Sequence, residues 1–225
     1  MDKTAIRDAA TMIVLRDRLT APSVLMGQRG AGAAFMPNKF VVPGGAVDPV
    51  DATVPLAAPV CAPCDSRLTE ASTLAPGTLA AAAIRELWEE TGLILGRAGD
   101  WPDPPKGWRG FGASGHLPDP SGLRFVFRAI TPPGLSRRFD ARFFLVDADR
   151  LTGDLDDFSG AEDELGLLHW VPLDEVRKLD LPFITKIVLA EVRARLPSVD
   201  APEDVPFFRN DDEARLVRRL GRGEA

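Results

Sequence analysis

The spacing of apolar and polar residues along this chain predicts a series of short strands. Strands are expected at residues 10–15, 24–28, 123–130, 138–146 and 166–171. The runs at 123–130 and 138–146 alternate apolar and polar side chains, which is the two-residue period of a strand. Residues 17–22 separate the first two strands and have the composition of a hairpin connection.

Helices are predicted between and after these strands. The longest covers residues 78–91, with Thr78 as its N-cap and Gly92 where a C-terminal cap takes positive φ. Further helices are expected to start at residues 172–175 with Asp174 as the cap, to cover about 183–195, and to cover 211–219.

Three carboxylates gather on one side of the helix at 78–91. Glu86, Glu89 and Glu90 fall within an arc of about 100°, because residues three and four apart share a helix face. Leu87 and Trp88 point the other way, toward a core. Like charges this close repel one another unless a cation neutralises them, and hard divalent cations prefer carboxylate oxygens. The alternative is an ordinary solvated acidic face, and the helix alone leaves both interpretations open.

Two segments together resemble the signature of the Nudix hydrolase family. That signature has a glycine, five residues, Glu, seven residues, and then Arg-Glu-apolar-any-Glu-Glu-any-Gly-apolar. Residues 85–93 read Arg-Glu-Leu-Trp-Glu-Glu-Thr-Gly-Leu and match every fixed position of the second half. Upstream, the apolar residues 40–42 run into a Pro-Gly-Gly turn, in which Gly45 matches the opening glycine.

The middle of the signature departs from the family pattern. Asp51 stands where the family has Glu, and 33 residues rather than seven separate it from Arg85. Residues 52–77 are therefore an insertion, which we expect to be a loop excursion outside the sheet. The resemblance implies that Asp51 pairs with Arg85, because Gly77, at the in-line spacing, has no side chain for the pair.

The resemblance implies a fold and a reaction. The fold is an α/β/α sandwich with a mixed sheet, formed as one domain by residues 9–196, with a C-terminal extension at 197–225. The reaction is attack by metal-activated water on a diphosphate, with Mg²⁺ or Mn²⁺ as the cofactor. The implied metal ligands are Glu86, Glu89, Glu90 and the backbone carbonyl of Gly45 or Ala46.

Two further residues receive catalytic roles from the same resemblance. Arg85 lies one turn from Glu89 and would orient the carboxylates through charged hydrogen bonds. Glu86 is either a third ligand or a base. Glu164 precedes the last strand at the point where the family often adds an acid, and the alternative is a solvated acidic loop.

Substrate-binding residues are expected in the strands and loops beyond the helix. Arginines alternate with phenylalanines at 124–128 and 138–144, and Arg137 and Arg138 are the best candidates for binding a pyrophosphate. Outward-facing strand charges are the alternative. Trp108 and Phe111, in a long loop at 96–122, would stack on a base or cover the substrate, or else would plug the loop onto the core.

Composition limits the partners. A chain of 225 residues with 45% hydrophobic content can bury one core, and a net charge of −6 argues against nucleic acid. No apolar run approaches a membrane span and the N-terminus does not resemble a signal peptide, so we expect a cytoplasmic protein without a membrane partner. The expected partner is a small-molecule diphosphate, and a homodimer is left open. The two cysteines, Cys61 and Cys64, are too few for a structural zinc site.

Three classes of function remain. The first is a pyrophosphohydrolase, and the insertion together with the Arg-Phe-Asp-Ala-Arg-Phe-Phe segment resembles the branch that contains a peroxisomal coenzyme A diphosphatase. Coenzyme A or its acyl esters are then the expected substrates, with ADP-ribose or another nucleoside diphosphate derivative as the rival. The second class is a non-catalytic ligand-binding module of the same fold, and the third is a metal-buffering protein.

Overall fold

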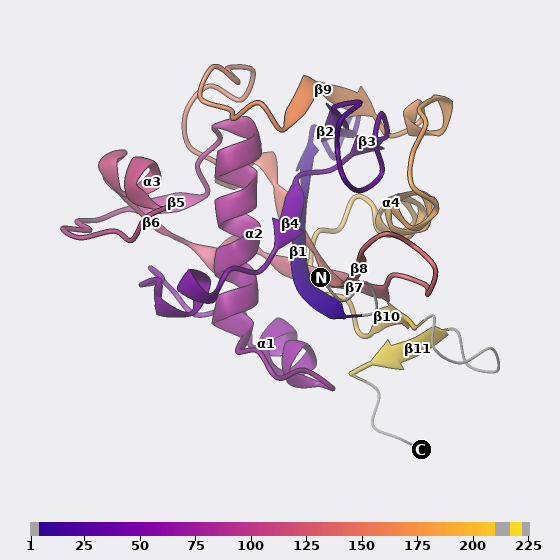
Figure 1. The fold of residues 1–225 in the computed structure, drawn as a ribbon, viewed down its shortest axis with the longest axis horizontal. Helices are drawn as coiled ribbons and strands as arrows, with labels where there is room; N and C mark the ends of the chain where they lie inside the picture. The colour runs from indigo at the N-terminus through magenta and orange to yellow at the C-terminus, as the bar shows by residue number, and fades with distance from the viewer. Residues whose placement is uncertain (1–4, 210–216, 222–225) are drawn as a thin grey trace.

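A mixed sheet lies between two helices in the computed structural model, which describes residues 5–209 and 217–221 (Figure 1). The strands are β1 (Ile6–Arg16), β2 (Ser23–Arg29), β3 (Phe40–Val41), β4 (Gly44–Ala46), β5 (Gly96–Ala98), β6 (His116–Pro118), β7 (Arg124–Ile130), β8 (Arg138–Asp147), β9 (Leu165–Pro172), β10 (Val205–Phe208) and β11 (Val217–Leu220). The α-helices are α1 (Ala62–Thr69), α2 (Pro76–Thr91), α3 (Arg109–Ala113) and α4 (Phe183–Arg195). Short 3₁₀ turns cover Pro49–Thr53, Pro120–Gly122, Ala148–Arg150 and Val176–Lys178.

The sheet is mixed because strands of both directions meet in it. Its main path runs β11-β10-β7-β8-β1-β2-β3, with β4 paired to β1 and β9 paired to β2. β1 is parallel to β8 and antiparallel to β2 and β4. The short pair β5–β6, with α3 beside it, projects outside this sheet on the α2 side (Figure 1).

Both faces of β1 are buried, which makes it the centre of the sandwich. Met12 and Val14 pack into the core that contains α2, whereas Ile13 and Leu15 pack into the core that contains α4. Successive strand residues point to opposite faces, so one apolar run supplies both layers. The α/β/α sandwich and the hairpin between the first two strands are confirmed.

The ends of the helices differ in part from the sequence-based predictions. α2 begins at Pro76, with Ala75 rather than Thr78 as the N-cap, because proline suits the first helical position. Gly92 ends α2 with a φ of 76°, as predicted. The expected helix from residues 172–175 is wrong, since β9 extends to Pro172 and only a 3₁₀ turn follows, preceded by Glu175 and not capped by Asp174.

The C-terminal segment extends the sheet. β10 runs parallel to β7, and β11 pairs antiparallel with β10. The expected helix at 211–219 is therefore wrong at residues 217–219, which belong to β11, while residues 211–216 lie outside the described residues. Two strands of the segment 197–225, expected as a C-terminal extension, therefore belong to the central sheet.

The insertion packs against the sandwich without adding a strand to it. Residues 52–77, all described, contain α1, whose Cys64 and Leu68 lie in the same core as α2. Buried arginines of the sheet hold the end of the segment. Arg128 donates to the carbonyls of Glu70 and Ala71, and Arg142 donates to Ser72 Oγ. The alternating arginines thus include two that are structural, neither outward-facing nor placed to bind a phosphate.

Candidate active site

The signature glycines lie against the acidic face of α2. The backbone N–H of Gly44 in β4 donates to Glu90 Oε2 at 2.7 Å. A Cβ added to Gly45 would stand 2.5 Å from the Glu86 carboxyl carbon. Only glycine allows β4 to approach the carboxylates this closely, which explains the residue type at position 45.

Arg85 organises the carboxylates around it. Its Nε and Nη2 donate to the two oxygens of Asp51 at 3.0 and 3.1 Å, which confirms the expected pair. Nη1 donates to Glu86 Oε1 at 2.8 Å and to Glu89 Oε2 at 2.7 Å. Nη2 also donates to the Ala46 carbonyl at 3.0 Å. A planar guanidinium with five donors therefore joins the 3₁₀ turn, β4 and α2.

Burial makes this group of carboxylates costly to ionise. It raises the pKa of Glu86 to about 7, against the opposing charge of Arg85. It also raises the pKa of Glu90 well above its ordinary value, and the neighbouring Glu86 charge adds to the effect. Burial is also the main cause of the raised pKa of Glu89. A bound cation would reverse these shifts by stabilising the ionised forms.

The fit to a divalent metal rests on one unpaired atom. Glu90 Oε1 is buried and has no hydrogen-bond partner. The charge of Glu86 acts directly on Glu90, so the two carboxyl groups are neighbours. Mg²⁺ is commonly held by one or two carboxylates and keeps several water ligands. Glu86 and Glu90 therefore fit such an ion.

The complete three-carboxylate set is not assembled as a metal cage. Within residues 5–209 and 217–221, no group of three or more His, Cys, Asp or Glu side chains is arranged to hold a metal ion. The reason is visible in the hydrogen bonds, since Arg85 occupies an oxygen of Glu86 and an oxygen of Glu89.

Glu164 lies at the same edge of the site. It accepts a hydrogen bond from Arg29 Nη2 at 2.8 Å, and its side chain is 54% exposed. Its charge contributes to the raised pKa values of Glu86 and Glu90, which places it beside the acidic face of α2. The preceding loop also docks there, because the Glu162 N–H donates to the Glu89 carbonyl at 2.7 Å.

Arg29, at the end of β2, was not recognised from the sequence. Its Nη2 is bound to Glu164, but its Nε is buried without a partner. Its charge lowers the pKa of Glu90, so it lies near the carboxylates. The glycine-rich composition of residues 27–34 predicts a flexible loop, but β2 extends as far as Arg29. The available signal was a lone arginine at the end of an apolar strand.

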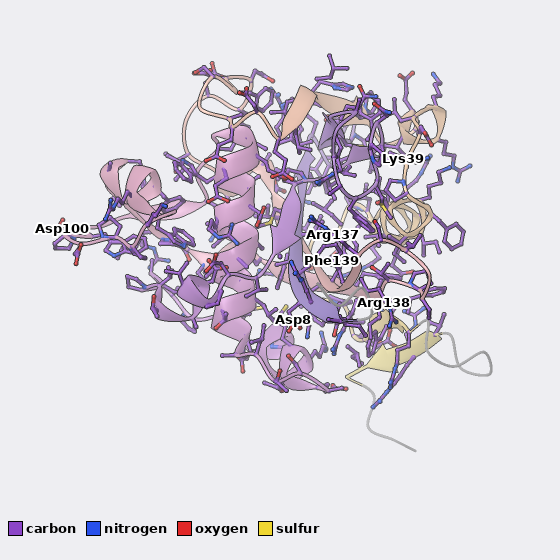
Figure 2. All side chains as sticks on the ribbon, in the orientation of Figure 1. Asp8, Lys39, Asp100, Arg137, Arg138 and Phe139 are labelled. Atoms are coloured by element: carbon purple, nitrogen blue, oxygen red, sulfur yellow. The ribbon has the colours of Figure 1, made fainter. Side chains whose placement is uncertain are left out.

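Arg137 and Arg138 have different surroundings although they are adjacent in the chain. Arg137 lines a cavity of about 420 Å³ together with Phe139, and that cavity adjoins Gly44 and Gly45. Arg138 does not line it, and its Nε donates to the Thr131 carbonyl at 3.0 Å. Arg138 is the first residue of β8, whereas Arg137 lies in the loop that precedes the strand. Figure 2 labels Arg137, Arg138 and Phe139, which lie in the region of β1, β7 and β8.

Trp108 and Phe111 are core residues, which corrects their assignment as substrate-binding residues. Both are completely buried. Their rings meet edge to face at 5.3 Å, and Trp108 Nε1 donates to Asp51 Oδ1 at 3.3 Å. The loop around α3 therefore packs against α2 through these aromatic rings, which agrees with the alternative that they anchor the loop to the core. No base could stack on either ring without unpacking this region.

The two cysteines are unpaired thiols of the insertion. Cys64 is buried, its Sγ accepts a hydrogen bond from the Phe125 N–H, and burial raises its pKa to about 12. A thiol with so high a pKa is a poor nucleophile and a poor metal ligand at neutral pH. This favours the interpretation of Cys64 as a packing residue.

The chain is similar in fold to solved structures of known proteins. No family model and no curated protein matches the chain. The chain is similar to the crystal structure of a Nudix hydrolase from Alicyclobacillus acidocaldarius, with 29% identity and a TM-score of 0.60 over 84% of this chain and 91% of that one. It also resembles the Nudix domain of Shewanella oneidensis NrtR complexed with ADP ribose, with 12% identity and a TM-score of 0.50 over 86% of this chain and 90% of that one.

These similarities establish the fold as that of the Nudix hydrolases. The first supports a pyrophosphate-cleaving hydrolase of that family, and the second, at lower identity, supports the fold alone. Among the described residues, no helix is both long enough and apolar enough to cross a membrane.

Proposed function

We propose that this chain hydrolyses a pyrophosphate bond with the help of Mg²⁺ or Mn²⁺. The observation that carries the proposal is the buried, unpartnered Oε1 of Glu90 beside the raised-pKa carboxyl of Glu86. A cation is the partner that satisfies both features. When bound, it lowers the pKa of a water ligand and offsets charge on the phosphoryl oxygens.

The residues around that position have distinct roles in the proposal. Glu90 and Glu86 hold the ion, helped by the backbone carbonyl of Gly45 or Ala46. Arg85 fixes Glu86 and Glu89 by its hydrogen bonds, so that the carboxylates need not reorganise during the reaction. Glu89 completes the acidic face, and its second carboxylate oxygen would be available to a cation while Arg85 holds the first.

Glu164 is the candidate general base. It is exposed enough to exchange protons with water and stands at the edge of the carboxylate group. In the reaction, the water oxygen bonds to one phosphorus and its proton passes to Glu164. The bond from that phosphorus to the bridging oxygen breaks, and the second phosphate leaves with that oxygen.

The finer substrate assignment remains part of the proposal. Coenzyme A or its acyl esters are favoured by the resemblance of the interrupted signature to the coenzyme A diphosphatase branch. ADP-ribose or another nucleoside diphosphate derivative is the rival. A non-catalytic ligand-binding module is the alternative class, and the ADP-ribose complex of NrtR shows that a Nudix domain can bind such a ligand.

The direct test is turnover of a diphosphate panel with Mg²⁺, with Mn²⁺ and in excess chelator. Hydrolysis that requires the metal and is lost in Glu90→Gln supports the enzyme. Tight binding of a diphosphate without turnover under any metal would support the binding module instead. A cytoplasmic location and a homodimer also remain predictions, which fractionation and sedimentation would test.

A further inference from the structure

The cavity next to β4 has two ends of different character. One end touches Gly44, Gly45, Arg29 and Glu164, and so reaches the carboxylate site. The rest lies on the α4 side of the sheet, because its β1 residues, Ala9 among them, share a strand face with Ile13. A single ligand could therefore place one part at the carboxylates and another part in the cavity.

Large apolar side chains predominate in the walls away from the carboxylates, although Arg7 and Arg137 also line the cavity. The apolar side chains are those of Phe35, Ile130, Leu135, Phe139, Phe143 and Phe183. Phe183 is 70% exposed and Leu135 is 41% exposed, so the apolar surface continues to the mouth. Large apolar side chains left in water at a cavity mouth favour an apolar partner.

Two loops meet over this apolar part. The rings of Phe35 and Phe139 pack edge to face at 5.3 Å. Ser136 Oγ donates to the Ala34 carbonyl at 3.2 Å. The contacts join the loop after β2 to the loop between β7 and β8, giving the cavity a closed side.

The cavity offers little to read the polar edge of a nucleobase. Its polar lining residues are three arginines, Glu164 and three threonines, and no Asn, Gln, Asp or His is among the described lining residues. Of these threonines, Thr131 already accepts a hydrogen bond from the Phe139 N–H at 3.0 Å, and Thr185 is only 5% exposed. Burying a base edge without partners is unfavourable, whereas an aliphatic chain needs none.

Arg29 supplies an anion anchor at the junction of the two ends. Its buried Nε is an unused donor, while Glu164 holds the outer part of the guanidinium. A phosphate oxygen is the acceptor that suits a guanidinium best. Arg29 is thus placed to bind the phosphate that connects the carboxylate site to the apolar cavity.

We infer that the cavity binds an aliphatic group carried directly on the diphosphate, and that Arg29 holds the adjoining phosphate. The inference rests on the proposed pyrophosphate hydrolysis and assigns that site an alkyl diphosphate in place of the nucleoside diphosphate derivatives considered above. An alkyl diphosphate would be cleaved to an alkyl phosphate and orthophosphate, as water bonds to one phosphorus and the bridging P–O bond breaks.

The test of the cavity is a chain-length series. Isopentenyl and geranyl diphosphate differ by five carbons, and wild type should show a KM at least about tenfold lower for geranyl diphosphate because more apolar surface is buried. Phe183→Ser and Leu135→Ser should shrink that ratio, because each removes apolar surface from the cavity. Leu19→Ser is the matched control, because Leu19 is 73% exposed and does not line the cavity.

The test of the phosphate anchor compares Arg29 with Arg16, since each forms an ion pair with a carboxylate. Arg29→Gln should raise the KM of both diphosphates by a similar factor, without changing their ratio. Arg16→Gln is the control, because Arg16 makes a comparable ion pair with Asp156 at 2.7 Å, and should leave both values unchanged. The melting temperature of Arg29→Gln shows whether this variant still folds. If it does not, Arg29→Lys replaces it in the test, because lysine keeps the positive charge but lacks the Nε donor.

The outcomes separate the inference from the proposed function. Equal KM values across the chain series, or a preference for ADP-ribose unaffected by Phe183→Ser, would overturn the aliphatic assignment and leave a pyrophosphohydrolase that binds a base. If wild type cleaves no diphosphate, the proposed function fails. Calorimetry without metal would then compare the binding of geranyl and isopentenyl diphosphate. Tighter binding of geranyl diphosphate would still support an aliphatic ligand in the cavity, and equal or weaker binding would overturn it.

Discussion

Arg85 and Asp51 form a bidentate, fully buried ion pair although 33 residues of chain separate them. The pair bridges the insertion at its base, joining the 3₁₀ turn after β4 to the middle of α2. It explains how a signature interrupted by so long a segment still positions its carboxylates. The insertion begins after Asp51 and ends before Arg85, so the ion pair holds the two halves of the signature together.

Asp51→Asn should destabilise the protein strongly, because it leaves the Arg85 charge buried and partly unpaired. The expected loss is about 3–5 kcal/mol of unfolding free energy, measured by urea denaturation. Asp51→Glu, which keeps the charge and restores the residue type of the family signature, should lose less. Equal stability of Asp51→Asn and wild type would contradict a structural role for this pair.

Glu90→Gln should remove most hydrolysis while the fold is kept. The glutamine can still accept from the Gly44 N–H, but it supplies no charge to the cation, so kcat should fall at least about 100-fold. Unfolding and turnover are measured on the same preparation. Glu175→Gln, a surface change in an exposed ion pair with Lys178, is the control and should keep full activity.

The metal-free protein should become less stable as pH rises through the range from about 4.5 to about 7. The ordinary Glu86 pKa of 4.5 applies to the unfolded chain and burial raises it to about 7 in the fold, so the folded state binds more protons within that window. Its stabilising contribution is present below pH 4.5 and is lost as pH passes 7. Melting temperatures measured in chelator should fall accordingly.

Two controls identify the source of that pH dependence. Glu86→Gln should make the profile shallower, because one titrating group is gone while Glu89 and Glu90, whose pKa values are also raised, remain. Adding Mg²⁺ at pH 8 should raise the melting temperature of wild type more than that of Glu86→Gln. A profile that is identical in wild type and Glu86→Gln would mean that other groups control it.

Arg137→Ala and Arg138→Ala should behave differently although the residues are adjacent. Arg137 lines the cavity, so its loss should raise KM several-fold with little change in kcat. Arg138 binds the Thr131 carbonyl, so its loss should lower stability by about 1 kcal/mol and leave KM unchanged. Kinetics with saturating metal distinguish the two, and a KM effect confined to Arg138→Ala would reverse the assignment.

Trp108→Ala should reduce stability rather than substrate affinity. The ring is completely buried between Trp101 and Phe111, so truncation should cost about 3–5 kcal/mol. Affinity is compared at a temperature where the variant remains folded. A raised KM without loss of stability would indicate that the loop opens to the substrate.

The sequence by itself determined the parts of this protein that depend on local periodicity. Glu86, Glu89 and Glu90 had to share a face once their helix formed, and Gly92 had to end it, because both follow from residues within one or two turns. The strand pattern around β7 and β8 was predictable for the same reason. The resemblance to the Nudix signature, rather than local periodicity, predicted Asp51 as the partner of Arg85.

Tertiary structure alone decided which of these surfaces meet. Arg137 ends the loop before β8 and Arg138 begins the strand, and only the packing of that loop decides that Arg137 is the one that borders the cavity. Trp108 and Phe111 are buried because their loop folds back onto α2, and Arg29 influences Glu90 because the end of β2 and Gly44 of β4 border the same cavity. Contacts between segments far apart in the chain set burial and charge environment, and no local pattern records them.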